Sequence, residues 1–228
     1  ILTDKVMSIK RYVPTGFTIP NGYMRENYLI ENVATHDYLS ITYVGSLYHN
    51  QPIEEFLQAF KVSIDNLQKP AMKILFLGLK SNMNAYNRVM QEMQGYEDYI
   101  VCTDRMPKQE VIQWQAASHY LLSVTYEDMK GIPGSKLYEY IALRKPVIVF
   151  PGDEDLIENT LSETGQGIVA RSKKEMSKLL CRIYKDYEVG NILDTTINNP
   201  AIDAHDRKTH VAKLAKLLDI FGNESMHI

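Results

Sequence analysis

Lys136 and Glu139 are the residues whose types and spacing point most directly to chemistry. They lie in residues 131–150, GIPGSKLYEYIALRKPVIVF, which predict a loop, a short helix and a buried strand. Residues three apart share one face of a helix. The first turn of a helix has free N–H groups and partial positive charge, so it attracts phosphate and disfavours a lone cation. A lysine at such a turn suits a phosphate and a carboxylate one turn later suits a ribose diol, so the segment indicates a bound nucleotide.

Two simpler explanations fit the same residues. Lys136 and Glu139 could form an exposed ion pair, which typically contributes ~0–1 kcal/mol to stability and has no function. Ser135 could instead begin a capping box, but that motif requires Glu or Gln at the position that Tyr138 occupies. The phosphate site and the plain ion pair both stay open on the sequence.

The elements that would position these residues alternate along the chain. Apolar or β-branched runs predict strands at 41–44, 73–77, 99–102, 120–124, 147–150 and 167–170. Helical patterns occupy 52–66, 84–94, 107–118, a short stretch from Lys136, 155–163, 173–187 and 204–221. Strands that are apolar throughout and separated by helices are typical of a parallel sheet buried on both faces. The sequence therefore predicts a doubly wound, mainly parallel α/β sheet.

In such a sheet the ligand lies beyond the carboxyl ends of the strands. Turn and polar residues follow the predicted strands at those ends: Gly45-Ser46, Gly78, Thr103-Asp104, Tyr126-Glu127 and Pro151-Gly152. The helix of Lys136 begins at the same edge. Residues 1–38 do not share the alternation, and we expect them to form an appendage or linker ahead of a domain at 39–228.

Length and composition describe an ordinary globular protein. The 228 residues are 45% hydrophobic and 23% charged, which fits one large domain or one domain with an appendage. A net charge of -3 argues against a nucleic-acid binder. Two cysteines and six scattered histidines have no metal-binding spacing, so no metal is expected. So few cysteines do not suggest a disulfide scaffold, so a reducing, cytoplasmic location is expected. No apolar run approaches the ~20 residues of a membrane span, and no secretory leader is recognisable.

Several segments resemble family 4 glycosyltransferases over roughly residues 17–221. Residues 133–140, PGSKLYEY, followed by KPVI at 145–148, resemble the donor-binding signature of that family. Residues 19–23, IPNGY, resemble the crossing between its two domains, and Val44-Gly45-Ser46 resembles the phosphate loop of its second domain. The resemblance implies one Rossmann-like half of a GT-B fold. Residues 1–38 would be the tail of the N-terminal domain and the interdomain linker, and 39–228 the donor domain with its closing helix.

The resemblance also implies an activity and its partners. It implies a retaining, metal-independent glycosyltransferase, hexosyltransferase-like, that uses a nucleotide sugar as substrate and needs no cofactor. The acceptor would be a sugar or a lipid-linked sugar, as in the synthesis of cell-surface polysaccharides, bound by an N-terminal domain that this chain lacks. The isolated chain is accordingly expected to be inactive.

Carried over position by position, the resemblance assigns roles to individual residues. Glu139 would hold the ribose hydroxyls and Lys136 would lie beside the diphosphate, and these two are the predicted catalytic residues. The backbone of 131–135 would approach the phosphates and the sugar, Gly45 and Ser46 would face the diphosphate from the other side, and 103–106 would flank the base. The predicted donor-binding set is Gly45, Ser46, Thr103, Arg105, Met106, Glu127, Gly131, Ile132, Pro133, Gly134, Ser135, Lys136, Leu137 and Glu139.

Three departures from the family pattern bear on activity. Many members carry a second glutamate eight positions before Glu139, where this chain has Gly131, and Glu127 could substitute for it. Residues 46–50, SLYHN, have no permanent cation where many members have Arg and Lys, so the diphosphate would depend on Lys136, helix amides and His49. Arg144 stands at the customary glycine after the helix and would have to accept a left-handed backbone.

Other functions stay open on the sequence. The chain could be a nucleotide-sugar-binding module without transferase activity, a GT-B nucleotide-sugar epimerase, or a structural domain that binds no nucleotide. A basic stripe on the 173–187 helix could contact anionic lipid at the inner face of a membrane, at ~1 kcal/mol per residue, although interleaved Glu175 and Asp186 favour a solvated face. The stripe consists of Lys174, Lys178, Arg182 and Lys185.

Overall fold

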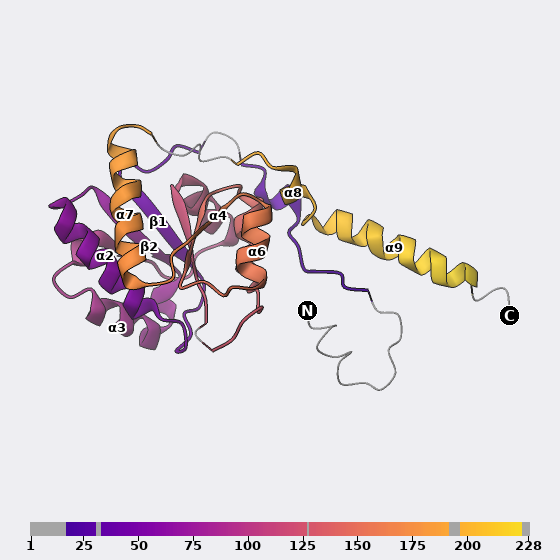
Figure 1. The fold of residues 1–228 in the computed structure, drawn as a ribbon, viewed down its shortest axis with the longest axis horizontal. Coiled ribbons are helices and arrows are strands. Elements are labelled where there is room, and N and C mark those ends of the chain that lie inside the picture. Colours follow the sequence, from indigo (N-terminus) through magenta and orange to yellow (C-terminus); the bar gives the residue numbers. More distant parts are fainter. Residues whose placement is uncertain (1–16, 31–32, 127, 192–196, 225–228) are drawn as a thin grey trace.

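A six-stranded parallel sheet with helices on both faces forms the body of the protein (Figure 1). The computed structural model describes residues 17–30, 33–126, 128–191 and 197–224. The strands lie in the order β3-β2-β1-β4-β5-β6, and each neighbouring pair is parallel. The predicted doubly wound α/β sheet is confirmed. The strands are β1 (Leu39–Val44), β2 (Met72–Leu77), β3 (Ile100–Cys102), β4 (Tyr120–Val124), β5 (Val147–Phe150) and β6 (Gly167–Val169).

Two groups of helices cover the sheet. Helices α2 (Ile53–Leu67), α3 (Met83–Glu92) and α7 (Lys173–Glu188) pack on one face, where their apolar side chains join those of β1, β2 and β4 in the main core. Helices α5 (Ser135–Ala142) and α6 (Leu156–Glu163), with Ile112 of α4 (Lys108–Ala117), pack on the other face against β4 and β5. Short 3₁₀ turns are η1 (Arg25–Tyr28), η2 (Leu79–Ser81) and η3 (Glu97–Tyr99).

The closing helix differs from the prediction. A single helix over 204–221 was expected, but the chain forms a short α8 (Pro200–Asp203) and a separate α9 (Arg207–Glu224). The break has a physical cause at Asp206, whose backbone pairs with Tyr23 and whose carboxylate accepts the N–H of Lys208 at 3.0 Å. The predicted start at Ala204 is therefore wrong.

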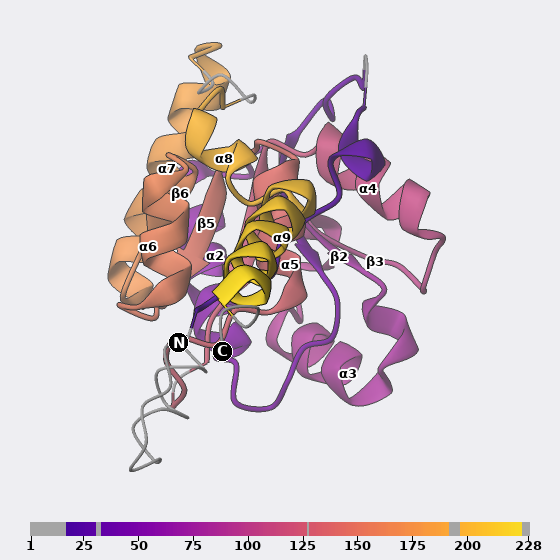
Figure 2. The same cartoon turned by 90° about the vertical axis from the view of Figure 1, so that its right-hand side faces the viewer.

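Helix α9 and the N-terminal segment leave the sheet together. The Tyr23 N–H donates to the His205 carbonyl at 3.1 Å, and the Arg207 N–H donates to the Tyr23 carbonyl at 2.8 Å. From this junction α9 projects well beyond the sheet (Figure 1), and Figure 2 views it nearly along its axis. Within the described ranges, no helix has both the length and the apolar character that a membrane span requires.

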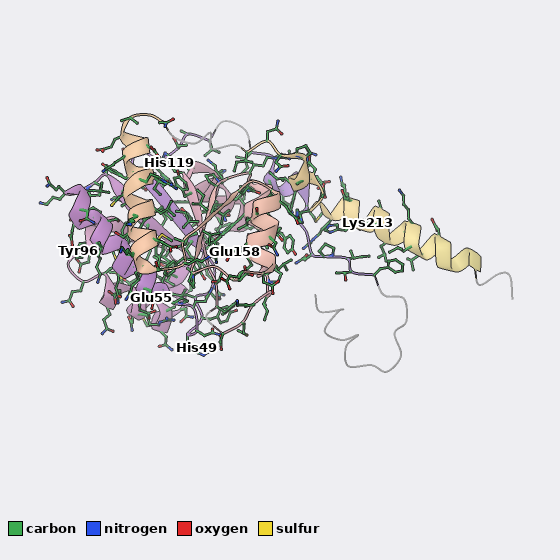
Figure 3. The ribbon with its side chains drawn as sticks, in the orientation of Figure 1. His49, Glu55, Tyr96, His119, Glu158 and Lys213 are labelled. Carbon is green, nitrogen blue, oxygen red and sulfur yellow. The ribbon has the colours of Figure 1, made fainter. Side chains whose placement is uncertain are left out.

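The strand order reverses between β1 and β4, which are neighbours in the sheet although β2 and β3 come between them in the chain. Such a switch point at the carboxyl edge of a parallel sheet is where ligands bind. His49 follows β1 and His119 precedes β4, and Figure 3 shows them at opposite edges of the domain. The edge that holds His49 is therefore the one that positions the site.

Candidate functional site

Helix α5 begins without a side-chain cap. Its N-cap is Gly134, in an extended conformation, and Ser135 already lies in the first turn. The capping box considered from the sequence therefore does not form. The Leu137 N–H bonds to the Gly134 carbonyl at 3.1 Å. The preceding amides of the first turn have no intrahelical acceptor, so the helix start can receive an anion.

Lys136 and Glu139 form the ion pair that was one of the two explanations. Lys136 Nζ lies 2.8 Å from Glu139 Oε2, with the lysine side chain 39% exposed and the glutamate 17% exposed. The lysine also reaches the loop after β1, because a Cβ placed on Gly45 would lie 3.6 Å from Lys136 Cε. The pair thus stands where the start of α5 meets the β1 loop, so its presence leaves the phosphate explanation intact.

A cavity of about 390 Å³ opens at the switch point, between the ends of β1 and β4 and the start of α5. Many of the predicted donor-binding residues line it together although they come from separate parts of the chain. They are Gly45, Ser46, Ile132, Gly134, Ser135, Lys136 and Leu137.

A second cavity of about 210 Å³ shares Val44, Gly45 and Ser46 with the first, so the β1 loop borders both. Arg105 and Met106, which the resemblance assigns to the base, line this second cavity. Thr103 does not line it. Its hydroxyl accepts the Gly78 N–H at 3.0 Å and donates to the Asp104 carbonyl at 3.0 Å, so it fixes the loops beneath the cavity.

Glu139 faces a third, smaller hollow that the sequence did not predict. Tyr28, Lys108 and Arg207 line it with Glu139, so residues from η1, α4 and α9 meet at this carboxylate. Burial, followed by the negative charge of Glu139, raises the pKa of Tyr28 well above its ordinary value. On the side of this hollow, Glu139 therefore faces two cations and a phenol that stays protonated, in addition to its partner Lys136.

Gly131 and Pro133 lie beside the larger cavity and do not line it. Gly131 has a positive φ of 66°, and a Cβ there would lie 2.5 Å from Asp155 Oδ2. A side chain at Gly131 would therefore need both a strained backbone and movement of Asp155. Glu127, the proposed substitute for the second glutamate, lies outside the described residues.

The floor of the larger cavity holds polar side chains that sequence reasoning missed. The Tyr140 hydroxyl accepts the Val44 N–H at 3.3 Å, and the Tyr43 hydroxyl donates to the Ser46 carbonyl at 2.9 Å. Gln51 Nε2 donates to the Val124 carbonyl at 2.6 Å, which ties the β1 loop to β4. Burial raises the pKa of Tyr43 and of Tyr140, so both phenols stay neutral. In the sequence, only the position of Tyr43 near the end of a predicted strand and of Tyr140 directly after Glu139 indicated that these tyrosines lie at the site.

Two further observations concern the backbone of Arg144 and the residues that could hold a metal. Arg144 has a φ of 55°, the left-handed backbone expected at the position where the family has glycine. No group of three or more His, Cys, Asp or Glu residues in the described ranges is placed to hold a metal.

Comparison with known proteins identifies relatives of this architecture. The family model described as glycosyl transferases group 1 matches residues 39–186. No curated protein shows significant sequence similarity to the chain. A glycosyltransferase from Rickettsia africae superposes with a TM-score of 0.68 at 13% identity, over 90% of this chain and 57% of that one.

Two further solved structures show the same likeness. Sucrose-phosphate synthase from Thermosynechococcus elongatus has a TM-score of 0.68 at 15% identity, over 98% of this chain and 57% of that one. Anabaena HepE, solved with UDP and glucose, has a TM-score of 0.62 at 14% identity, over 88% of this chain and 56% of that one. At these identities the likeness establishes a shared fold, and the chain spans little more than half the length of each relative.

Proposed function

The chain belongs to the glycosyl transferases of group 1, and from that membership we propose that it forms the nucleotide-sugar donor site of a glycosyltransferase. The observation that carries the proposal is the meeting of three features at one cavity. The uncapped start of α5, the Lys136 side chain and the Gly45-Ser46 loop all line the space at the switch point. Together they offer amides, a cation and close backbone approach, which suit a diphosphate.

In the proposed reaction the anomeric carbon of the sugar breaks its bond to the diphosphate oxygen and bonds to an acceptor hydroxyl oxygen. The hydroxyl proton passes to the departing diphosphate, on which negative charge develops. Lys136 and the first amides of α5 would stabilise that charge, an electrostatic role that lowers the barrier when the groups are held in advance. Glu139 would accept hydrogen bonds from the ribose hydroxyls. We propose a retaining transfer in which these groups, rather than a metal ion, supply the positive charge.

Further parts of the proposal concern the whole protein. The structures of HepE with UDP and glucose and of a sucrose-phosphate synthase support a hexose as the transferred group. Residues 1–38 would then be the tail of an acceptor-binding domain and the linker, with residues 1–16 outside the described part of the chain. We also propose a sugar or lipid-linked acceptor, a role in cell-surface polysaccharide synthesis and a cytoplasmic location. Contact of the α7 stripe with the inner face of the membrane is the less favoured alternative, because Glu175 and Asp186 interrupt the stripe. The isolated chain would bind donor without transferring sugar.

One observation favours a second candidate, a binding module that holds a nucleotide sugar and does not transfer it. Gly131 offers no carboxylate where many members have one, and the direction of its missing side chain is already occupied by Asp155. An assay of sugar transfer by the full-length protein separates the two candidates, because a binding module forms no product.

Calorimetric titration tests the donor site itself. The chain is titrated with UDP, GDP, ADP and their common sugar conjugates, together with Glu139→Ala and a control, Glu92→Ala. Glu92 pairs with Lys61 at the α2–α3 contact, away from the cavities. Binding of one nucleotide class, weakened by Glu139→Ala and unchanged by Glu92→Ala, supports the proposal. A folded chain that binds none of these nucleotides refutes it.

A further inference from the structure

The larger cavity has an aromatic wall formed by Tyr48 and Tyr126. Both tyrosines line the cavity, one from the loop after β1 and the other from the loop after β4. Their ring centroids lie 6.1 Å apart with an interplanar angle of 47°. Tyr48 is 54% exposed and Tyr126 is half-buried. Two neighbouring aromatic rings that line a cavity and are not fully buried offer a contact for a ligand.

Hydrogen bonds beneath the rings hold this wall in place. The Tyr48 N–H donates to Gln51 Oε1 at 2.9 Å, and Gln51 Nε2 donates to the Val124 carbonyl at 2.6 Å. A second bond joins the same two loops, because Asn50 Nδ2 donates to Asp128 Oδ1 at 3.0 Å. The loops after β1 and β4 are therefore joined at two levels, so little ordering of the wall remains to be done when a ligand binds.

The wall is also uncharged. Among the described residues that line the cavity, Lys136 is the single ionic side chain. Burial, and then the nearby Tyr48 hydroxyl, raise the pKa of Tyr126, so its phenol stays neutral. Arg88, which donates to the Tyr48 carbonyl at 2.9 Å, is already paired with Glu54 at 2.7 Å. A ligand group that carries charge would therefore lose water against the two rings without gaining a free counter-ion there, which is unfavourable. A neutral ring with C–H groups on one face and hydroxyls at its rim meets no such penalty.

We propose that Tyr48 and Tyr126 bind the glycosyl group of the donor and select a neutral pyranose over one that carries a carboxylate. The inference rests on the proposed donor site, because Lys136 and the start of α5 must take the diphosphate for the sugar to fall against the rings. Tyr48 lies three residues beyond Gly45, where the Lys136 stem passes. A pyranose that follows the diphosphate along this loop reaches the aromatic pair.

The test measures what the sugar adds to nucleotide affinity. By calorimetry the chain is titrated with UDP and UDP-glucose, GDP and GDP-mannose, and ADP and ADP-glucose, and the nucleotide class that binds is then titrated as its uronate conjugate. The ratio of Kd for the nucleoside diphosphate to Kd for its sugar conjugate is compared between wild type, Tyr48→Ala and Tyr126→Ala. Tyr99→Ala is the matched control, because Tyr96 and Tyr99 pair at 6.5 Å and the same 47°. Tyr96 lies apart from His49, the neighbour of Tyr48 (Figure 3).

We expect wild type to bind the neutral conjugate about tenfold more tightly than the bare nucleotide and than the uronate. In Tyr48→Ala and in Tyr126→Ala the ratio should fall toward unity, while the nucleoside diphosphate binds within about twofold of wild type. Tyr48→Phe, which keeps the ring, and Tyr99→Ala should leave the ratio unchanged.

Three outcomes overturn the inference. A ratio that survives both alanine substitutions, with nucleotide binding intact, removes the wall from donor recognition and leaves the donor site standing. A uronate that binds the wild-type chain as tightly as the neutral sugar overturns the selectivity for a neutral pyranose and also leaves the donor site standing. Absence of binding by every nucleotide refutes the donor site and this inference together.

Discussion

Replacing Lys136 by methionine distinguishes an ordinary surface ion pair from a phosphate site. The Lys136–Glu139 contact is 2.8 Å long, but the lysine side chain is 39% exposed, so solvent screens the attraction. As an ion pair it contributes ~0–1 kcal/mol to the free energy of unfolding. A charge-assisted hydrogen bond from the same lysine to a phosphate contributes about 1.5–3 kcal/mol, which corresponds to roughly 10–100-fold in affinity. The two explanations therefore predict different sizes of effect in different measurements.

For Lys136→Met we expect the free energy of unfolding to change by less than about 1 kcal/mol. We expect the affinity for a nucleoside diphosphate to fall by roughly 10–100-fold. The corresponding nucleoside, which has no phosphate, should bind the variant as it binds wild type. Glu139→Ala should weaken nucleoside and diphosphate alike, because its proposed partner is the ribose. Urea unfolding measures the first quantity, and calorimetric or NMR titration measures the others.

Lys61→Met is the matched control. Lys61 pairs with Glu92 between α2 and α3, with side-chain exposures of 23% and 19%, and its loss should lower stability without changing nucleotide affinity. If Lys136→Met weakens nucleoside and diphosphate equally, or lowers stability with no effect on binding, the phosphate assignment is wrong. In the full-length protein, Lys136→Ala should reduce turnover more than donor binding. Equal losses would mean that Lys136 only anchors the donor.

Three other predictions concern stability and are measured by urea unfolding. Burial lowers the pKa of Lys145, which is 7% exposed, to about 8. Between about pH 8 and pH 10 the unfolded chain therefore binds more protons than the folded chain, so stability should rise with pH over that range. Lys145→Met should flatten the rise and increase the free energy of unfolding at pH 7 by up to ~3 kcal/mol. Burial, then the charges of Lys145 and His36, lower the pKa of His119 to about 4. Stability should accordingly fall by up to ~3 kcal/mol from pH 6.5 to pH 4, and a slope as steep in His119→Asn as in wild type would contradict this. Gly131→Ala should lower the free energy of unfolding by about 2–4 kcal/mol, because φ is positive and the new Cβ meets Asp155. Adding Asp155→Ala should recover part of that loss, and strictly additive effects of the two substitutions would exclude the clash.

The apolar runs in the sequence were sufficient to locate the strands but did not predict every strand boundary. The predicted strands at 120–124 and 147–150 coincide with β4 and β5, because both are apolar from end to end apart from Ser123. Strand β1 begins two residues earlier than predicted. Its second residue, Ser40, is a buried polar residue that bonds to His119 across the sheet. A partner 79 positions away satisfies that hydroxyl, and no local pattern announces it.

The residues of the site likewise include some that the sequence predicted and some that it did not. The start of α5 was predictable because its glycine, serine, lysine and glutamate are close together in the sequence and lie on or directly before one helix. Tyr28 and Arg207 were not, because they reach Glu139 only when η1 and α9 meet across the domain. The aromatic pair likewise depends on the β1 and β4 loops becoming neighbours at the switch point. Local chemistry was therefore visible in the sequence, whereas its surroundings required the fold.

The charges at the larger cavity explain why sugar and diphosphate would be bound by different means. Lys136 is the ionic side chain among the described residues that line this cavity and contributes one positive charge, and the start of α5 contributes about half a charge. The sum, about +1.5, faces the diphosphate, which every such donor carries, so charge alone provides little discrimination between donors. Lys136 is instead best used as negative charge grows on the departing diphosphate, since an interaction that strengthens in the transition state raises the rate. Discrimination between donors then falls to shape and to uncharged contacts, which are the properties of the wall formed by Tyr48 and Tyr126.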